Sequence, residues 1–260
     1  MTTRRFLLLA GLFAGLGLAV PALAQEETTW AEIRSSLIGP RPVEDAGTIL
    51  TLDAPRRAED AALVPITVRL KAPEGDPRRF KTLTLVVDEN PSPLVGTIRF
   101  PEARRSFDIA TRVRVNSYSY VRVIAEAEDG RLFMTKAFVK AAGGCSAPAS
   151  KDPAEAKAHL GEMRFRTFAA QGEAQVQVRH PNYSGLQMDQ VTRLYTPAWY
   201  VETLSVRQGA RPLFGFEGGI SISEDPTFRF SYAGSGEPVA VEARDSEGRV
   251  FQRTFPADGS

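Results

Sequence analysis

Residues 63–71 read Leu-Val-Pro-Ile-Thr-Val-Arg-Leu-Lys, and this stretch sets the period of the whole chain. Val64, Ile66, Val68 and Leu70 recur at every second position, so on a β-strand their side chains point to one face. A strand with one apolar face must bury that face against another layer of structure. The stretch therefore predicts a half-buried strand of a layered β fold.

The same alternation extends outward in both directions from this strand. In the first half it predicts strands over residues 47–52, 80–88, 94–100, 107–115, 119–128 and 132–139. In the second half it predicts strands over residues 163–168, 174–179, 200–208, 212–217, 227–232, 239–244 and 250–255. About seven short strands separated by turn residues are typical of an antiparallel β-sandwich. We predict an all-β protein with two immunoglobulin-like sandwiches, over residues 25–140 and 159–260.

Three further features complete this organisation. Residues 30–38 have a helical spacing of apolar side chains, with Thr29 as N-cap, and predict a short N-terminal helix. Residues 141–158 are rich in Ala, Gly, Ser and Pro and predict a linker, with a helical turn over 152–157. The turn sequences at 128–133 and 246–251 are alike, which suggests that the two sandwiches are related.

Residues 1–24 have the pattern of a secretory signal peptide. Arg4 and Arg5 precede an apolar run, and Ala22-Leu23-Ala24 forms a small-residue cleavage site. The run is shorter than the roughly 20 residues that a membrane-spanning helix needs, so a retained anchor is the less favoured alternative. We expect export to the periplasm by the Sec route or, given the paired arginines, by the twin-arginine route, with no membrane contact after cleavage.

The charge balance excludes one class of partner. The chain has 32 basic and 31 acidic residues, without a basic block, so nucleic acid is not an expected partner. With a single cysteine there is no internal disulfide, and stability must come from packing.

That single cysteine, Cys145, is the strongest functional candidate. It lies in Ala141-Ala142-Gly143-Gly144-Cys145-Ser146-Ala147-Pro148-Ala149-Ser150, hereafter the Cys145 segment, which suits neither a strand nor a helix. We expect an exposed thiol on a mobile arm, with Gly143 and Gly144 supplying flexibility and access to a partner's pocket. A thiolate there could attack a disulfide or accept a sulfur-containing group. The alternatives are a buried small hydrophobe, an incidental surface thiol and an intermolecular disulfide.

Other chemistry has weaker support. A cysteine–histidine catalytic pair would need His159 or His180 held at the thiol, and a mobile arm does not provide that geometry. Two histidines and one cysteine show no metal-ligand spacing, so we predict no metal, no cofactor and no catalytic residues.

The first half of the chain resembles the SoxY family in its motifs, and the second half resembles the SoxZ family. SoxY and SoxZ are the two subunits of the sulfur carrier of bacterial thiosulfate oxidation. The SoxY-like features are residues 88–95 (Asp-Glu-Asn-Pro-Ser-Pro-Leu-Val), the turn at 128–130 and Gly143-Gly144-Cys145. The SoxZ-like features are His180-Pro181, Ser184-Gly185, residues 197–200 (Pro-Ala-Trp-Tyr), Gln208-Gly209 and residues 223–226 (Ser-Glu-Asp-Pro). The order of these motifs is similar to that of fused SoxYZ-like carriers associated with quinoprotein dehydrogenases.

The resemblance implies that Cys145 carries a sulfur intermediate covalently between periplasmic redox enzymes, either Sox-type enzymes or a quinoprotein dehydrogenase with a c-type cytochrome. It also implies that the SoxY-like and SoxZ-like halves pair within the chain. Two features depart from the family pattern: Ser146-Ala147-Pro148 replaces a Gly-Gly ending, and the cysteine is internal rather than C-terminal. Deep threading into an enzyme is harder for an arm held at both ends, so a shallow encounter is expected.

We therefore interpret the chain as a periplasmic, non-enzymatic carrier loaded at Cys145. The rival hypothesis is a non-covalent adaptor for a periplasmic quinoprotein dehydrogenase or cytochrome, in which the thiol is incidental. A thiol-dependent enzyme is a third, weaker hypothesis.

Overall fold

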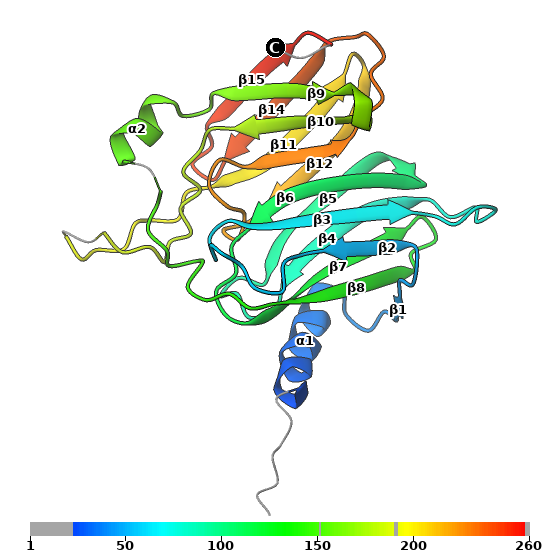
Figure 1. The fold of residues 1–260 in the computed structure, drawn as a ribbon, viewed down its shortest axis with the longest axis horizontal. Coiled ribbons are helices and arrows are strands. Elements are labelled where there is room, and N and C mark those ends of the chain that lie inside the picture. The colour runs from blue at the N-terminus through cyan, green and yellow to red at the C-terminus, as the bar shows by residue number, and fades with distance from the viewer. Residues whose placement is uncertain (1–22, 151, 190–191, 258–260) are drawn as a thin grey trace, which may run out of the picture.

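The structure is a computed structural model that describes residues 23–150, 152–189 and 192–257 (Figure 1). Most of the expected signal peptide, residues 1–22, lies outside the described residues. Within the described ranges, no helix combines the length and the hydrophobicity required to cross a membrane.

The described residues include two α-helices and one short 3-10 helix. Helix α1 (Leu23–Leu37) begins seven residues earlier than the predicted helix, because the preceding Ala-Gln-Glu-Glu favours helix. Helix α2 (Pro153–Ala158) confirms the predicted helical turn, and the Asp152 carboxylate caps it by accepting from the Ala154 amide at 2.8 Å. The 3-10 helix η1 spans Ala169–Gln171.

Strands occupy the predicted positions, with one addition. The first half contains β1 (Val43–Asp45), β2 (Leu50–Asp53), β3 (Val64–Lys71), β4 (Phe80–Val87), β5 (Leu94–Arg104), β6 (Ser106–Val113), β7 (Ser119–Ala127) and β8 (Leu132–Val139). The second half contains β9 (Met163–Phe168), β10 (Glu173–Val178), β11 (Val201–Gln208), β12 (Arg211–Gly218), β13 (Thr227–Ser231), β14 (Val239–Asp245) and β15 (Val250–Phe255). Only β1, which pairs in parallel with β8, was not predicted.

The strands form two sheets, and both sheets run through both halves of the chain. One has the order β1-β8-β7-β4-β5-β12-β11-β14-β15 and the other β2-β3-β6-β13-β10-β9. The halves join where β5 pairs with β12 and β6 pairs with β13, both antiparallel. The all-β prediction is confirmed, and the two predicted sandwich halves are joined edge to edge through shared sheets. Joining the sheets removes four exposed strand edges, because β5, β6, β12 and β13 would each be unpaired on one side in an isolated half.

The two halves repeat one topology, stacked one above the other in Figure 1. The order β8-β7-β4-β5 corresponds to β15-β14-β11-β12, and β2-β3-β6 corresponds to β9-β10-β13. The similar turn sequences occupy equivalent hairpins: Ala127 donates to the Arg131 carbonyl, and Asp245 donates to the Arg249 carbonyl, both at 3.0 Å. The strands that join the halves therefore pair with their equivalents in the other half, β5 with β12 and β6 with β13. This is the arrangement of a pseudo-twofold pair of subunits.

One hydrophobic core fills the space between the sheets across the junction. Phe107 of the first half stacks near Phe214 and Phe230 of the second, with ring centroids 5.7 and 6.4 Å apart. All three rings are buried. Because aromatic burial contributes strongly to stability, the halves should fold and unfold as one unit.

Candidate functional site

Cys145 is buried where the two halves meet. Its exposed fraction is 0%, so the expectation of an exposed thiol is wrong for this structure. Burial raises the pKa of the thiol to about 11, and the Arg114 guanidinium offsets part of that rise. In this closed position the sulfur is protonated at neutral pH and poorly nucleophilic.

The first half holds the Cys145 segment through its backbone. The amide of Gly143 donates to the Asn116 carbonyl at 2.7 Å, and the amide of Gly144 donates to the Val115 carbonyl at 3.1 Å. Both acceptors lie within three residues of the end of β6, so the segment runs beside the end of that strand. These bonds bring the thiol into contact with the sandwich instead of leaving it on an arm.

In this closed position the two glycines have conformational and steric roles, and their expected role in flexibility stays a prediction. Gly143 has a φ of +79°, in the left-handed region that favours glycine. A Cβ on Gly144 would lie 2.1 Å from the carbonyl oxygen of Ala61 and 2.6 Å from that of Val115. Glycine is therefore required for the backbone to reach the buried position.

The second half holds the same segment through three polar side chains: Ser184, Gln187 and Glu224. The Ser184 hydroxyl donates to the carbonyl of Cys145 itself. The side-chain amide of the glutamine donates to the Ala147 carbonyl at 2.9 Å, and the glutamate accepts from the Ser150 amide at 3.1 Å. Because each half holds one side of the Cys145 segment, the closed position depends on their pairing.

Arg114 bridges the two halves beside the thiol. One terminal nitrogen donates to the Gly144 carbonyl at 3.1 Å, and the other donates to the Asn182 carbonyl at 3.2 Å. The residue is 1% exposed, and burial lowers the pKa of its guanidinium. A full positive charge thus lies inside the protein, next to the residue that precedes Cys145.

The SoxY-like motif at residues 88–95 supports this arrangement. Buried Asn90 donates to the Arg114 carbonyl at 2.8 Å and to the Ser221 hydroxyl at 2.9 Å, and it accepts from the Asn116 amide at 2.8 Å. One side chain therefore fixes the end of β6, which holds the Cys145 segment, and connects it to the second half. The sequence marks these residues only as a SoxY-like motif and gives no sign of their polar partners, which are distant in the chain.

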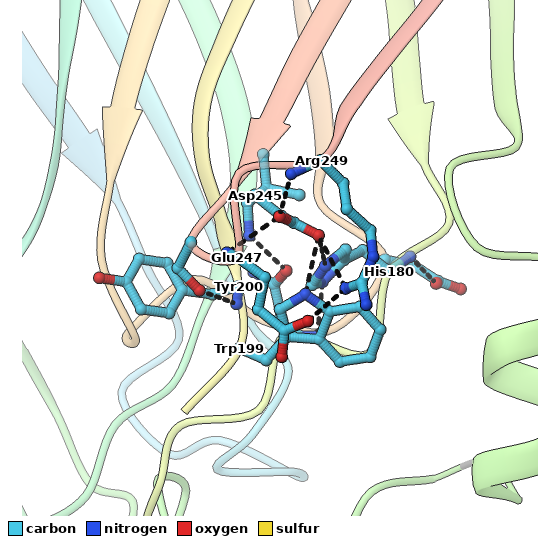
Figure 2. A network of polar contacts seen from close by, with 10 residues as sticks. His180, Trp199, Tyr200, Asp245, Glu247 and Arg249 are labelled. Carbon is cyan, nitrogen blue, oxygen red and sulfur yellow. Dashed lines mark hydrogen bonds and ion pairs between the residues drawn. The ribbon is translucent and has the colours of Figure 1, made fainter. Parts of the chain in front are cut away.

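A second polar network surrounds His180, and Figure 2 shows its side chains converging on Asp245. Asp245 accepts from the Trp199 indole at 2.8 Å, and its carboxylate lies 3.7 Å from His180 Nε2. Nδ1 of the imidazole accepts from the Asn182 amide at 3.0 Å. Since Asn182 also binds Arg114, this network is connected to the thiol site through two residues.

Neither histidine is a partner for the thiol among the described residues. His180 is engaged as above, and exposed His159 contacts Glu162 at 2.7 Å. Within that part of the chain, no group of three His, Cys, Asp or Glu side chains could hold a metal ion. The site therefore consists of one thiol, one buried cation and hydrogen-bonding groups.

Comparison with known proteins identifies both halves. The family model for the sulfur oxidation protein SoxY matches residues 34–145, and the model for the sulphur oxidation protein SoxZ matches residues 164–256. The SoxY match ends at Cys145.

A solved structure of the sulfur carrier protein SoxY from Chlorobium limicola f thiosulfatophilum is also similar. It has 23% sequence identity and a TM-score of 0.39, over 46% of this chain and 96% of that chain. No curated protein matches the sequence. From the two family matches, the chain belongs to the sulfur oxidation families, as a SoxY domain fused to a SoxZ domain.

Proposed function

We propose that the protein is a periplasmic carrier that holds a sulfur-containing intermediate covalently on Cys145 and presents it to redox enzymes. The observation that carries the proposal is the SoxY family match, which ends at the only cysteine and is followed by a SoxZ match. The signal-like residues 1–24 support the location. On this proposal the protein is a covalent carrier and not a catalyst.

The buried position of the thiol means that loading requires the Cys145 segment to open. Two properties favour opening: the segment has no strand or helix, and Ser146 and Pro148 are already exposed. Segments with few buried apolar contacts open locally at a small fraction of the global unfolding free energy. The closed state would protect the thiol, and the open state would load and unload it.

The loading step has a definite electron balance. When the Cys145 sulfur joins a sulfur atom of a thiol-level donor, one S–S bond forms and the S–H bonds break. Two protons pass to water, and two electrons pass to an oxidant. By family resemblance we assign that oxidant to a partner redox enzyme, a c-type cytochrome or a quinoprotein dehydrogenase.

The adaptor hypothesis retains one specific observation in its favour. A thiol that is 0% exposed with a pKa of about 11 is what an incidental, structural cysteine would show. The two hypotheses differ in what Cys145 carries in the cell.

Intact mass spectrometry separates them. The native protein is purified from the periplasm without reductant, beside Cys145→Ser and Cys145→Ala variants. We expect sulfur-containing adducts on the wild-type protein that are absent from both variants, which should remain folded. An unmodified wild-type mass, with partner binding equal in the variants, would support the adaptor and refute the carrier. Adducts retained in Cys145→Ser would refute Cys145 as the attachment site.

A further inference from the structure

Five large apolar side chains are exposed in the described part of the chain, and strand pairing places all five at the same end of the protein. They are Leu94, Tyr118, Leu194, Tyr195 and Val250. This is the end at which β8 leads into the Cys145 segment. Leu94 begins β5, Val250 begins β15, and Tyr118 directly precedes β7, whose first residue pairs with the last residue of β8. Exposed apolar residues gathered in one region are typical of an interaction surface.

Leu194 and Tyr195 are the most exposed of these residues, with exposed fractions of 69% and 63%. They are adjacent in the loop between β10 and β11, which Figure 1 shows in yellow-green, projecting beyond the ends of the strands. A single exposed apolar residue is ordinary on a protein surface, but two adjacent ones on a projecting loop leave an apolar tip in water. Burial of that tip against another protein would be favourable.

The loop is a hydrogen-bonded hairpin, hereafter the 183–199 hairpin, of which residues 183–189 and 192–199 are described. Tyr183 and Trp199 exchange two backbone hydrogen bonds at 2.8 and 3.0 Å, and Thr196 donates its amide to the Gln187 carbonyl at 2.8 Å. At the base of the hairpin the buried Trp199 indole donates to Asp245 at 2.8 Å. A surface that is held in place before binding loses little conformational entropy on docking.

The same hairpin holds the Cys145 segment. The Ser184 hydroxyl donates to the carbonyl of Cys145, and the Gln187 side-chain amide donates to the carbonyl two residues further on, at 2.9 Å. The Gln187 backbone carbonyl in turn accepts from Thr196, the residue after Tyr195. A protein bound to the hairpin tip would therefore lie next to the segment that carries the thiol.

From these contacts we propose that Leu194 and Tyr195 are the anchor residues of a docking site for the protein that acts on Cys145, and that this partner receives both side chains in an apolar pocket. The inference rests on the proposed carrier function and places the docking site in the second half of the chain, outside the SoxY-matched residues that contain the thiol. Tyrosine is among the residues that most often dominate binding energy at interfaces. The charged neighbours, Asp189 and Arg193, have opposite signs, so apolar burial and not net charge should supply the affinity.

Native loading tests the docking site through the double variant Leu194→Ser/Tyr195→Ser. The fraction of protein that carries an adduct on Cys145 is measured by intact mass after purification from the periplasm without reductant. We expect this fraction to fall by about tenfold, the effect of losing one strong anchor. Val250→Ser is the matched control, because it removes an exposed apolar side chain at the same end but outside the hairpin, and it should keep wild-type loading. Equal loading in the double variant and the wild type would overturn the inference.

Alkylation of the purified protein by iodoacetamide separates docking from access to the thiol. This small reagent needs no docking site, so the double variant should react at the wild-type rate. A changed rate would show that the two side chains control the closed position of the Cys145 segment instead, and would overturn the docking role.

Photo-crosslinking in cells tests whether the hairpin tip and the Cys145 segment meet the same protein. The photo-reactive residue p-benzoylphenylalanine replaces Leu194, Ser146 or, as a control, the exposed Ala210 in the turn between β11 and β12 at the opposite end. We expect positions 194 and 146 to crosslink one and the same protein, and position 210 to leave it uncaptured. No crosslink at 194, or different proteins at 194 and 146, would overturn the inference, while adducts on Cys145 would still support the carrier. A wild-type protein without adducts would refute the carrier function, and the inference with it.

Discussion

Gly144 packs its α-carbon against the carbonyl oxygen of Ala61, so closely that an added Cβ would lie 2.1 Å from that oxygen. The clash is with backbone that belongs to the sandwich, which cannot move aside as a flexible side chain would. This contact joins residues 83 positions apart and fixes the depth at which Cys145 lies.

Gly144→Ala should therefore displace the Cys145 segment and expose the thiol. We expect at least tenfold faster alkylation by iodoacetamide at pH 8 and a loss of about 1–3 kcal/mol in unfolding free energy, as in other overpacked sites. Gly234→Ala is the matched control, because its Cβ would meet its nearest neighbour at 3.4 Å, an ordinary contact. Unchanged alkylation in Gly144→Ala would show that the closed position does not depend on this contact.

The pH profile of alkylation should report the buried state of the thiol. With a pKa of about 11, the wild-type rate should rise about tenfold per pH unit from pH 7 to pH 10. This pH dependence of the alkylation rate is the same whether the thiol reacts in the closed position or after the segment opens. In both cases the closed, protonated protein is the predominant species, and one proton must leave before the sulfur reacts. A peptide of residues 141–150 should level off above its ordinary pKa, near ~8.5. A wild-type profile that levels off with the peptide would contradict the burial of Cys145.

The sequence predicts local structure well because strands with one buried face leave a two-residue period. Val64 and Ile66 mark β3 by themselves, and the hairpin likeness at residues 128–133 and 246–251 indicates the repeated topology. The pairing of β5 with β12 has no such signal, because the edge groups that pair there are backbone groups that every residue carries.

The candidate site was also predictable only in part, because the contacts that form it join residues that are far apart in the sequence. Cys145 stands out as the only cysteine, but its burial depends on Ala61, Arg114 and Ser184, which are distant in the chain. Ala61 and Arg114 lie in no motif, and the motif that contains Ser184 does not reveal its contact with Cys145. A run of Gly, Ala and Ser looks mobile by composition alone. In the folded protein these small residues instead allow the backbone to approach the sandwich closely.

The buried ion pair beneath helix α1 should be a major contributor to stability. Arg122 and Asp88 are at most 3% exposed, and the guanidinium also lies 4.4 Å from the Trp30 ring. Asp88→Asn leaves a buried charge without its counterion, so we expect a loss of about 3–5 kcal/mol in chemical denaturation. Glu217→Gln breaks a comparable but half-exposed pair with Arg99 and should cost less than about 1 kcal/mol. Equal losses in the two variants would contradict this assignment.

Protonation of His180 should destabilise the protein in mild acid. Burial lowers the pKa of this imidazole from 6.5 to about 4, although Asp245 favours the charged form. Between pH 4 and pH 6.5 the unfolded chain binds more protons at this imidazole than the folded chain does. The contribution of neutral His180 to the unfolding free energy is therefore fully present above pH 6.5 and is lost as the pH falls toward 4. Between pH 7 and pH 5 the wild type should lose about 2 kcal/mol more unfolding free energy than His180→Gln, whose amide oxygen can still accept from Asn182. Exposed His159→Gln should keep the wild-type dependence, and a His180→Gln profile that parallels the wild type would show that the imidazole does not titrate in this window.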